Sequence, residues 1–241
     1  MKAGIVGATG YGGIELLRLL TNHPQVKAIT LFSSSQAGEK FENIYPQFRG
    51  GESYVLHDLE PEKRKEDLDV IFLATPSGVS SQLTPQLQGS HAKVIDLSGD
   101  LRIKEPATYE QWYKKEAAPD GTLGNAVYGL PEWNQEQIEK ADLIANPGCY
   151  PTATLLGLGP VVKEGLVKPD SIVIDAKSGV SGAGKNPNPI THFAHAQENF
   201  QIYKVNQHQH IPEIEQQLTI WDDQLEPVTF STHLVPMTRG I

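Results

Sequence analysis

A glycine-rich turn between an apolar strand and an amphipathic helix constrains the fold of this chain more than any other feature. Residues 1–6 form a short apolar run, residues 7–13 read G-A-T-G-Y-G-G, and residues 14–20 carry apolar side chains at helical spacing. A strand, a glycine turn and a helix in this order predict a βα unit that binds phosphate, because the free N–H groups at the helix N-terminus attract anions. The sequence therefore predicts a sheet that binds a dinucleotide.

The glycine spacing is a variant of the usual dinucleotide fingerprint. It reads G-x-x-G-x-x-G instead of G-x-G-x-x-G. In this variant Gly7 permits the tight turn, and Gly10 lets the backbone approach the ligand. We expect five residues here to bind the cofactor: Gly7, Thr9, Gly10, Tyr11 and Gly12. The alternative is a glycine-rich turn without a ligand.

Three serines, residues 33–35, follow the second predicted strand, residues 26–32. A site that prefers NAD usually has Asp or Glu about 20 residues past the glycines, where the carboxylate binds the ribose 2′-hydroxyl. Here Ser34 and Ser35 offer hydroxyl groups, and Lys40 lies nearby in the sequence. These groups can bind a 2′-phosphate, which a carboxylate would repel. The pattern predicts NADP as the cofactor, with a simple polar turn as the alternative.

The next part of the chain alternates strands and helices, at residues 69–74, 79–87 and 92–97. This alternation predicts a parallel sheet whose ligands bind at the carboxyl ends of the strands. The loops at residues 75–78 and 98–102 are therefore candidate site loops. We expect Pro76 to contact the cofactor and Arg102 to bind a phosphate or carboxylate of the substrate, although many arginines are simply solvated.

Composition narrows the class of protein. The chain has 241 residues, 39% of them hydrophobic, with a net charge of −9 and a mean hydropathy of −0.34. These values favour a soluble protein with a sizeable core and argue against nucleic acid or an anionic membrane as partner. No stretch reaches the roughly 20 apolar residues of a membrane span. One cysteine and no recognisable signal peptide predict a reducing, cytoplasmic setting.

The single cysteine, Cys149, lies in the segment N-P-G-C-Y-P-T at residues 146–152. This segment breaks a short strand at residues 143–145 and precedes a helical pattern at residues 152–158. Cys149 is thus expected at or near a helix N-terminus, where the positive end of the helix dipole stabilises a thiolate. The alternative is a buried cysteine that packs like a small apolar residue.

The second half is less regular. We expect a polar, irregular stretch at residues 104–124 with helical pieces around residues 109–115, and strands near residues 172–177 and 228–234. We expect His208 and His210 to lie on an extended segment, where a spacing of two places them on one face. The pair could bind metal together with Glu213. Because the spacing fits no common zinc motif, we predict a catalytic histidine and no metal site.

Six motifs in a fixed order carry a resemblance that spans the whole chain. The chain closely resembles the N-acetyl-gamma-glutamyl-phosphate reductase family and, more distantly, the aspartate-semialdehyde dehydrogenases. The motifs are G-A-T-G-Y-G-G-I-E-L-L-R-L-L from Gly7, S-G-D-L-R from Ser98, Y-G-L-P-E from Tyr128, N-P-G-C-Y-P-T from Asn146, S-G-V-S-G-A-G-K from Ser178 and H-Q-H-I-P-E-I-E-Q from His208.

The resemblance implies an NADPH-dependent reductase of arginine biosynthesis that acts on a small acyl phosphate through a cysteine thioester. It implies that Cys149 is the nucleophile and that a histidine of the H-x-H-x-P-E motif is the acid/base. We prefer His210 for that role and assign His208 to substrate contact. We further assign Ser178 and Gly179 to cofactor binding and expect a homo-oligomer, either a dimer or a tetramer.

The implied architecture is α/β. We expect an NADP-binding domain with a Rossmann-type parallel sheet at residues 1–148, followed by an α+β catalytic and dimerisation domain at residues 149–241. Members of the family continue past the P-M-T-R-G segment, whereas this chain stops at Ile241. We therefore expect the second domain to be incomplete in this sequence, as in a C-terminally truncated reductase.

Three alternatives remain open at this point. An aspartate-semialdehyde dehydrogenase would use aspartyl phosphate in the same chemistry. A non-catalytic NADP-binding module would bury Cys149 as a core residue. A metal-dependent hydrolase would use His208, His210 and Glu213 as ligands.

The position of Cys149 generates a first prediction. If a helix N-terminus stabilises the thiolate, the rate of alkylation in the full-length protein rises with pH with a midpoint below the free-thiol value of about 8.5. Iodoacetamide labelling followed by mass spectrometry measures this profile, with free cysteine as the control. A midpoint at or above that of free cysteine would contradict the prediction.

Overall fold

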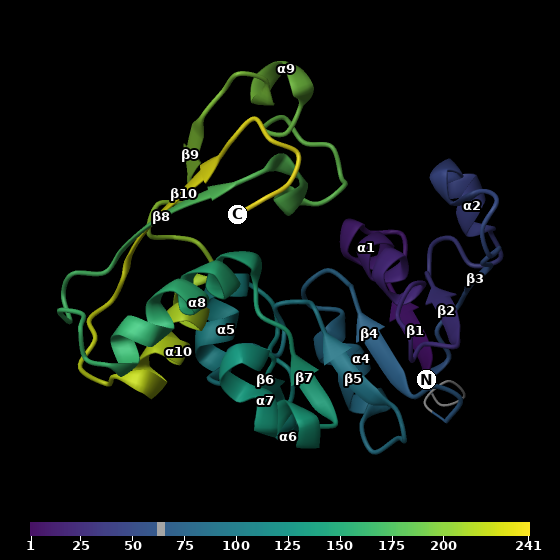
Figure 1. The fold of residues 1–241 in the computed structure, drawn as a ribbon, viewed down its shortest axis with the longest axis horizontal. Helices are drawn as coiled ribbons and strands as arrows, with labels where there is room; N and C mark the ends of the chain where they lie inside the picture. The colour runs from purple at the N-terminus through teal and green to yellow at the C-terminus, as the bar shows by residue number, and fades with distance from the viewer. Residues whose placement is uncertain (62–65) are drawn as a thin grey trace. The chain divides into compact units, whose positions relative to one another are not determined.

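The computed structural model describes residues 1–61 and 66–241 and divides the chain into two compact units (Figure 1). Unit 1 comprises Met1–Tyr109 and Lys115–Asn146, and unit 2 comprises Glu110–Lys114 and Pro147–Ile241. The assignment of residues 1–148 to NADP binding and of residues 149–241 to catalysis stays a prediction.

Unit 1 is built on a seven-stranded sheet with the strand order β3-β2-β1-β4-β5-β7-β6. All of its pairings are parallel, so the carboxyl ends of the strands lie along one edge. The predicted parallel sheet is confirmed. The strands are β1 (Lys2–Val6), β2 (Ala28–Phe32), β3 (Leu56–His57), β4 (Val70–Leu73), β5 (Lys93–Asp96), β6 (Val127–Tyr128) and β7 (Leu143–Ala145).

Alternate residues of the central strands enter two separate cores of unit 1. Ile5 and Leu31 pack with Leu17 of the first helix in one cluster, while Val6 and Phe32 pack in the other. Because successive side chains of a strand point to opposite faces, both faces of this sheet are apolar, as parallel sheets require. The described helices of unit 1 are α1 (Tyr11–Leu20), α2 (Phe41–Ile44), η1 (Pro46–Phe48), α4 (Ser80–Leu87), α6 (Asp120–Asn125) and α7 (Pro131–Lys140). Helix α5 (Pro106–Tyr113) begins in unit 1, and its residues 110–113 belong to unit 2.

The helical piece expected around residues 109–115 corresponds to α5, which begins earlier, at Pro106. The rest of the stretch at residues 104–124 is less irregular than expected, because α6 adds a second helix. Both are short, and their polar composition hides the few side chains that hold them. Tyr109 in α5 and Leu123 in α6 are almost completely buried. Tertiary packing of these side chains, more than helical periodicity, stabilises the two helices.

Unit 2 combines two longer helices with a three-stranded mixed sheet of order β8-β10-β9. β10 pairs parallel to β8 and antiparallel to β9. Helix α10 buries Ile211, Ile214 and Leu218, spaced three and four residues apart as one helix face demands. The elements are α8 (Cys149–Lys163), β8 (Val173–Ser178), η2 (Val180–Ala183), α9 (Phe193–Ala196), β9 (Gln201–Tyr203), α10 (Ile211–Trp221) and β10 (Thr229–Leu234).

Within residues 1–61 and 66–241, no helix is long and apolar enough to cross a membrane.

Two acidic side chains of unit 1, Asp96 and Asp100, are completely buried at the carboxyl end of β5. Burial, with a smaller contribution from the neighbouring Asp100, raises the pKa of Asp96 to about 6, although hydrogen bonds from Ser80 and Ser98 oppose the shift. The Ser98 N–H and hydroxyl donate to the two carboxylate oxygens of Asp96 at 3.0 and 2.9 Å. Folding therefore favours the protonated form of Asp96.

A pH-dependent stability follows from Asp96. Because its pKa rises from 3.8 to about 6 on folding, the folded chain binds the proton more tightly, and stability falls as the pH rises through that window. Asp96→Asn is neutral at every pH and should lose this slope. The unfolding free energy of the variant relative to wild type should rise by roughly 1–3 kcal/mol between pH 4 and pH 7, at about 1.36 kcal/mol per pKa unit.

Urea denaturation of the full-length protein at several pH values measures this difference. Asp69→Asn is the matched control, because the Lys2 N–H holds the pKa of Asp69 below its usual value and reverses the sign of the effect. A constant difference between Asp96→Asn and wild type across the range would refute the assignment.

Candidate active site

The glycine turn of unit 1 joins β1 to α1 and lies directly against the end of β4. Gly7 adopts a left-handed φ of +79°, and a Cβ there would lie 2.4 Å from the carbonyl oxygen of Ala74. A Cβ at Gly13 would lie 2.5 Å from the carbonyl oxygen of Gly7. These two positions therefore require glycine for the protein's own packing.

The two glycines between them are not required by packing. A Cβ at Gly10 would meet its nearest neighbour at 3.5 Å, and one at Gly12 would do so at 3.9 Å, both ordinary contact distances. Gly10 is the N-cap of α1 with a φ of −81°, and no side chain caps the helix. The missing side chains leave open space above a helix N-terminus, which is the arrangement that admits a pyrophosphate.

The turn is braced from a distant part of unit 1. The hydroxyl of Tyr45 donates a hydrogen bond of 2.6 Å to the backbone carbonyl of Thr9. The Tyr45 ring packs on Phe41 at a centroid distance of 5.2 Å. Of the other residues predicted to bind cofactor here, Tyr11 is exposed at the start of α1, whereas Thr9 is buried. The side chain of Tyr11 is therefore more accessible to a ligand than the hydroxyl of Thr9.

The serines after β2 differ in exposure. Ser33 is buried, and its N–H donates to the carbonyl of His57. Ser34, Ser35 and Lys40 are exposed. The two serines predicted to read the 2′-phosphate are therefore accessible to a ligand, and Ser33 anchors the loop that carries them.

The loops after β4 and β5 form a hydrogen-bonded edge of unit 1. Pro76 lies in the first of these loops. Arg102, in the second, is buried, and its guanidinium donates to the carbonyls of Asn146 at 2.7 Å and Leu97 at 2.8 Å. Arg102 thereby ties the end of β5 to the end of β7. Two N–H groups of Arg102 are therefore engaged with backbone carbonyls. The contact of Arg102 with the substrate stays a prediction.

Cys149 is the first residue of α8, and its N-cap is Gly148. The cysteine is exposed, and its predicted place at or near a helix N-terminus is confirmed. The helix both begins earlier and ends later than the predicted residues 152–158. Gly148 offers no capping side chain, and its carbonyl accepts from both the N–H and the hydroxyl of Thr152. The thiol thus lies where the helix dipole favours negative charge.

A buried carboxylate links the starts of the two main helices of unit 2. Glu213, in the first turn of α10, is completely buried. Its Oε1 accepts a hydrogen bond of 2.8 Å from the N–H of Gly148. The residue before the thiol is therefore held by α10, the helix that follows the two histidines.

The histidine pair does not lie on an extended segment as predicted. Residues 205–210 form turns, and His210 has φ −84° and ψ −10° as the N-cap of α10. A local hydrogen bond explains the difference, since the N–H of His210 donates to Nδ1 of His208 at 3.1 Å. The two rings still lie together, with centroids 4.7 Å apart.

Tyr150, the residue that follows the thiol, contacts both imidazoles. Its ring lies edge-on to His208 at 5.2 Å and to His210 at 6.0 Å. The hydroxyls of Tyr150 and Tyr203 are hydrogen-bonded at 2.8 Å, and burial raises the pKa of both phenols. Both tyrosines therefore stay protonated at neutral pH, and their rings pack against the imidazoles.

His208 is held in its neutral form. Burial, aided by the charge of Lys204, lowers the pKa of His208 to about 4. Because Nδ1 of His208 accepts a backbone N–H, the proton of the neutral ring lies on Nε2. His208 is thus a neutral hydrogen-bond donor near pH 7, which leaves His210 as the better candidate for proton transfer.

Ser178 is the last residue of β8, and Gly179 follows it. Another segment of unit 2 packs against these two residues. The N–H of Gly179 donates to the carbonyl of Gly240, and a Cβ at Gly179 would lie 2.9 Å from the backbone nitrogen of Arg239. Ser178 is buried. The P-M-T-R-G segment therefore fixes this loop, and the role of the two residues in cofactor binding stays a prediction.

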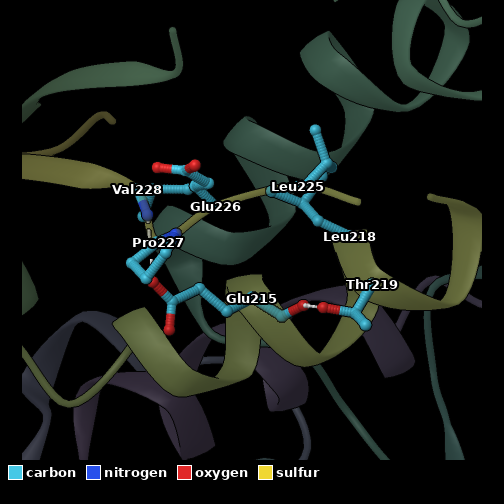
Figure 2. Close-up of a pocket in the computed structure, with 7 residues that line it drawn as sticks. All are labelled: Glu215, Leu218, Thr219, Leu225, Glu226, Pro227 and Val228. Carbon is cyan, nitrogen blue, oxygen red and sulfur yellow. Dashed lines mark hydrogen bonds between the residues drawn. The ribbon is translucent and has the colours of Figure 1, made fainter. Parts of the chain in front are cut away.

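Two cavities lie away from these residues. One, of about 150 Å³, lies between α10 and the segment before β10 (Figure 2), where Glu215 accepts the N–H of Val228 at 3.0 Å. It is smaller than the roughly 300–1,000 Å³ of typical ligand pockets. The other, of about 360 Å³, lies at the amino ends of β5 and β7, opposite the edge where parallel sheets bind ligands. Among the described residues, no three His, Cys, Asp or Glu side chains gather as metal ligands.

Sequence reasoning missed several residues that organise these sites. The sequence pattern suggests only a metal-ligand role for Glu213, and it singles out none of Tyr45, Tyr150 and Asp100. Three of the four lie inside the quoted motifs, which was the available signal: Tyr150 in N-P-G-C-Y-P-T, Asp100 in S-G-D-L-R and Glu213 in H-Q-H-I-P-E-I-E-Q. Tyr45 lies outside every motif, and only the fold reveals it.

Two family models match the chain. Residues 2–141 match the model described as semialdehyde dehydrogenase, NAD binding domain. Residues 149–241 match the model described as semialdehyde dehydrogenase, dimerisation domain. Together they cover nearly all of both units.

Similar proteins bear a more specific name. An N-acetyl-gamma-glutamyl-phosphate reductase of Halalkalibacterium halodurans is 60% identical over 241 residues, which are 100% of this chain and 70% of that protein. One of Bacillus cereus is 56% identical with the same coverage. Among solved structures, aspartate semialdehyde dehydrogenase II of Vibrio cholerae has a TM-score of 0.68 at 19% identity and covers 98% of this chain and 71% of that one. The likeness to this structure concerns the fold alone.

The hydrogen bond between Tyr45 and Thr9 generates a prediction. Tyr45→Phe removes only the hydroxyl, and a hydrogen bond of this kind contributes about 1 kcal/mol. We expect amide exchange in residues 7–13 of the full-length protein to accelerate roughly fivefold, since local opening becomes easier. Exchange detected by mass spectrometry or NMR measures the change.

Tyr54→Phe is the matched control for this experiment. Tyr54 lies in the same apolar cluster, but its hydroxyl donates to Glu52, two residues away. Equal acceleration in the two variants would mean that the cluster, and not the bond to Thr9, stabilises the turn.

Proposed function

Because the chain belongs to the semialdehyde dehydrogenase family, we propose that it reduces N-acetyl-gamma-glutamyl phosphate to N-acetylglutamate 5-semialdehyde and phosphate, with NADPH as the reductant. This reaction is a step of arginine biosynthesis. The observation that carries the proposal is the start of α8, where an exposed thiol precedes a tyrosine that contacts two imidazoles. Identity of 60% over the whole chain supports the choice of substrate.

The residues of unit 1 fit a dinucleotide phosphate. Gly10 and Gly12 leave room at an uncapped helix start, and Ser34 and Ser35 are exposed where a 2′-phosphate would bind. We assign cofactor binding to these residues together with Gly7, Thr9, Tyr11 and Pro76. We also assign Ser178 and Gly179 to cofactor binding. When bound, NADPH supplies the hydride of the reaction.

Cys149 begins the reaction as the nucleophile. Its thiolate attacks the acyl carbon, the bond to the phosphate oxygen breaks, and a thioester forms. The helix N-terminus favours the thiolate before attack. Glu213 holds the N–H of Gly148, so the residue before the nucleophile does not move when the helix start accepts charge.

The histidines take separate roles after the thioester forms. His210 gives a proton to the former carbonyl oxygen as the hydride arrives and takes it back when the thiohemiacetal collapses to the aldehyde. His208, neutral because of its low pKa, donates from Nε2 to the substrate. We assign Arg102 to the anionic end of the substrate, in addition to its bonds to the backbone.

The activity is tested in the reverse direction with the full-length protein. N-acetylglutamate 5-semialdehyde should reduce NADP⁺ only when phosphate is present, and Cys149→Ser should abolish turnover while NADP⁺ binding persists. NADP⁺ should be preferred to NAD⁺. A preference for aspartate semialdehyde would move the proposal to the other reductase of the family, and a fully active Cys149→Ser would end the thioester mechanism.

The two histidines can be separated by the same substitution. General acid–base catalysis contributes about 10²–10⁴-fold, so His210→Asn should lower kcat by that order with little change in KM. His208→Asn should act mainly through KM, because it removes a substrate contact. His23→Asn, at an exposed position, is the control and should change neither constant. The opposite pattern would exchange the two roles.

We also propose that the protein assembles as a dimer or tetramer of identical chains. The match to a dimerisation domain over residues 149–241 supports this. Unit 2 exposes the apolar side chains of Val173 in β8 and Ile202 in β9, and that of Phe200 just before β9. Exposed apolar side chains are the material from which interfaces between chains are built. Light scattering of the full-length protein measures its mass, and a monomer would exclude the proposal.

We propose the cytoplasm as the location of the protein, because a single cysteine among these 241 residues fits a reducing compartment. Fractionation of cells with an antibody to the protein tests this.

A further inference from the structure

Asp100 is a completely buried carboxylate whose partners all belong to the adjoining parts of unit 1. Its two oxygens each accept the N–H of Gly78 at 2.8 Å, and Oδ2 also accepts the N–H of Ser81 at 2.9 Å. The hydroxyl of Tyr109 donates to Oδ1 at 2.7 Å. Four hydrogen bonds thus converge on one side chain from the loop after β4, from α4 and from α5.

The carboxylate caps a helix that its own sequence leaves uncapped. The N-cap of α4 is Val79, which makes no side-chain hydrogen bond, and valine is among the poorest residues at this position. Asp100 supplies the missing acceptor for Ser81 from a different loop. It also holds Gly78, whose φ of +88° marks the sharp end of the loop at residues 75–78.

This loop borders the glycine turn of the dinucleotide site. The loop begins directly after Ala74, whose carbonyl oxygen would lie 2.4 Å from a Cβ at Gly7 and whose Cβ would lie 3.9 Å from one at Gly12. The N–H of Ala74 in turn donates to the carbonyl of Val6. One end of the loop is therefore fixed by the sheet beside the glycine turn, and the other end is fixed by Asp100.

We propose that Asp100 is a positioning residue for cofactor binding: it holds the loop at residues 75–78 in the conformation that contacts the dinucleotide, and Tyr109 holds the carboxylate in turn. This inference rests on the proposed function, because it takes the ligand of unit 1 to be NADP. A buried charge is a costly cap compared with a local serine or threonine. Its bidentate grip on Gly78 fixes the loop in a way that a local cap of α4 does not.

The test compares substitutions at the two ends of α4 in the full-length protein. Asp100→Asn loses the charge and one of the two acceptor oxygens, and Tyr109→Phe loses one hydrogen bond to the carboxylate. Thr122→Val is the matched control. The Thr122 hydroxyl donates to Oε1 of Gln88 at 3.0 Å, and Gln88 is the C-cap of α4, so this variant loosens the far end of the same helix.

The readouts are the dissociation constant of NADP⁺ by fluorescence titration, the KM for NADPH against kcat, and the unfolding midpoint. We expect Asp100→Asn to weaken NADP⁺ binding by about 5–20-fold and Tyr109→Phe by about 3–5-fold, as the loss of one or two hydrogen bonds implies. KM for NADPH should rise more than kcat falls. Thr122→Val should keep wild-type affinity even when its unfolding midpoint drops as far as that of Tyr109→Phe.

Three results would overturn the inference. Wild-type affinity in both Asp100→Asn and Tyr109→Phe would do so, as would equal weakening by Thr122→Val, which would reduce Asp100 to a structural cap. If Asp100→Asn does not fold, Tyr109→Phe against Thr122→Val decides the question. Failure of the wild type itself to bind NADP⁺ would instead remove the proposed function on which the inference rests.

Discussion

The tightest packing constraint in unit 1 is the close approach of Gly7 to the backbone carbonyl of Ala74. A single added carbon would lie 2.4 Å from the Ala74 oxygen, so the chain can leave β1 for α1 only through a residue without a side chain. This passage turns the start of α1 toward the carboxyl ends of the parallel strands. The open positions at Gly10 and Gly12, the brace from Tyr45 and the loop held by Asp100 all depend on it.

Unit 2 depends on a comparable link between two helix starts. Glu213 enters the first turn of α10 and accepts the N–H of Gly148, the cap of α8. Because the histidines directly precede α10 and the cysteine opens α8, one hydrogen bond sets both chemical groups in a common frame. Tyr150 completes this frame by filling the space beside both imidazoles. The chemistry proposed for unit 2 therefore uses helix starts, where backbone donors and side chains converge.

Much of this arrangement was predictable from periodicity and turn residues. The glycine turn, the strand at residues 69–74 and the helix start at Cys149 follow from local patterns that a short window of sequence contains. The segment at residues 205–210 did not follow, because the bond between His208 and the N–H of His210 replaces the extended conformation with a turn. The burial of Arg102 was equally hidden, since its partners Leu97 and Asn146 are brought together only by the sheet.

Cys149 is the single sulfhydryl among 241 residues, and it is exposed. An oxidant or electrophile that reacts with a thiol of this sequence therefore always reacts with the same sulfur atom. No second thiol within these 241 residues can form a disulfide with that atom. A sulfenic acid that peroxide forms there therefore finds no thiol in this stretch of sequence to capture it. Recovery then depends on thiols beyond these residues, and the redox state of the surrounding pool influences the fraction of protein that retains its nucleophile.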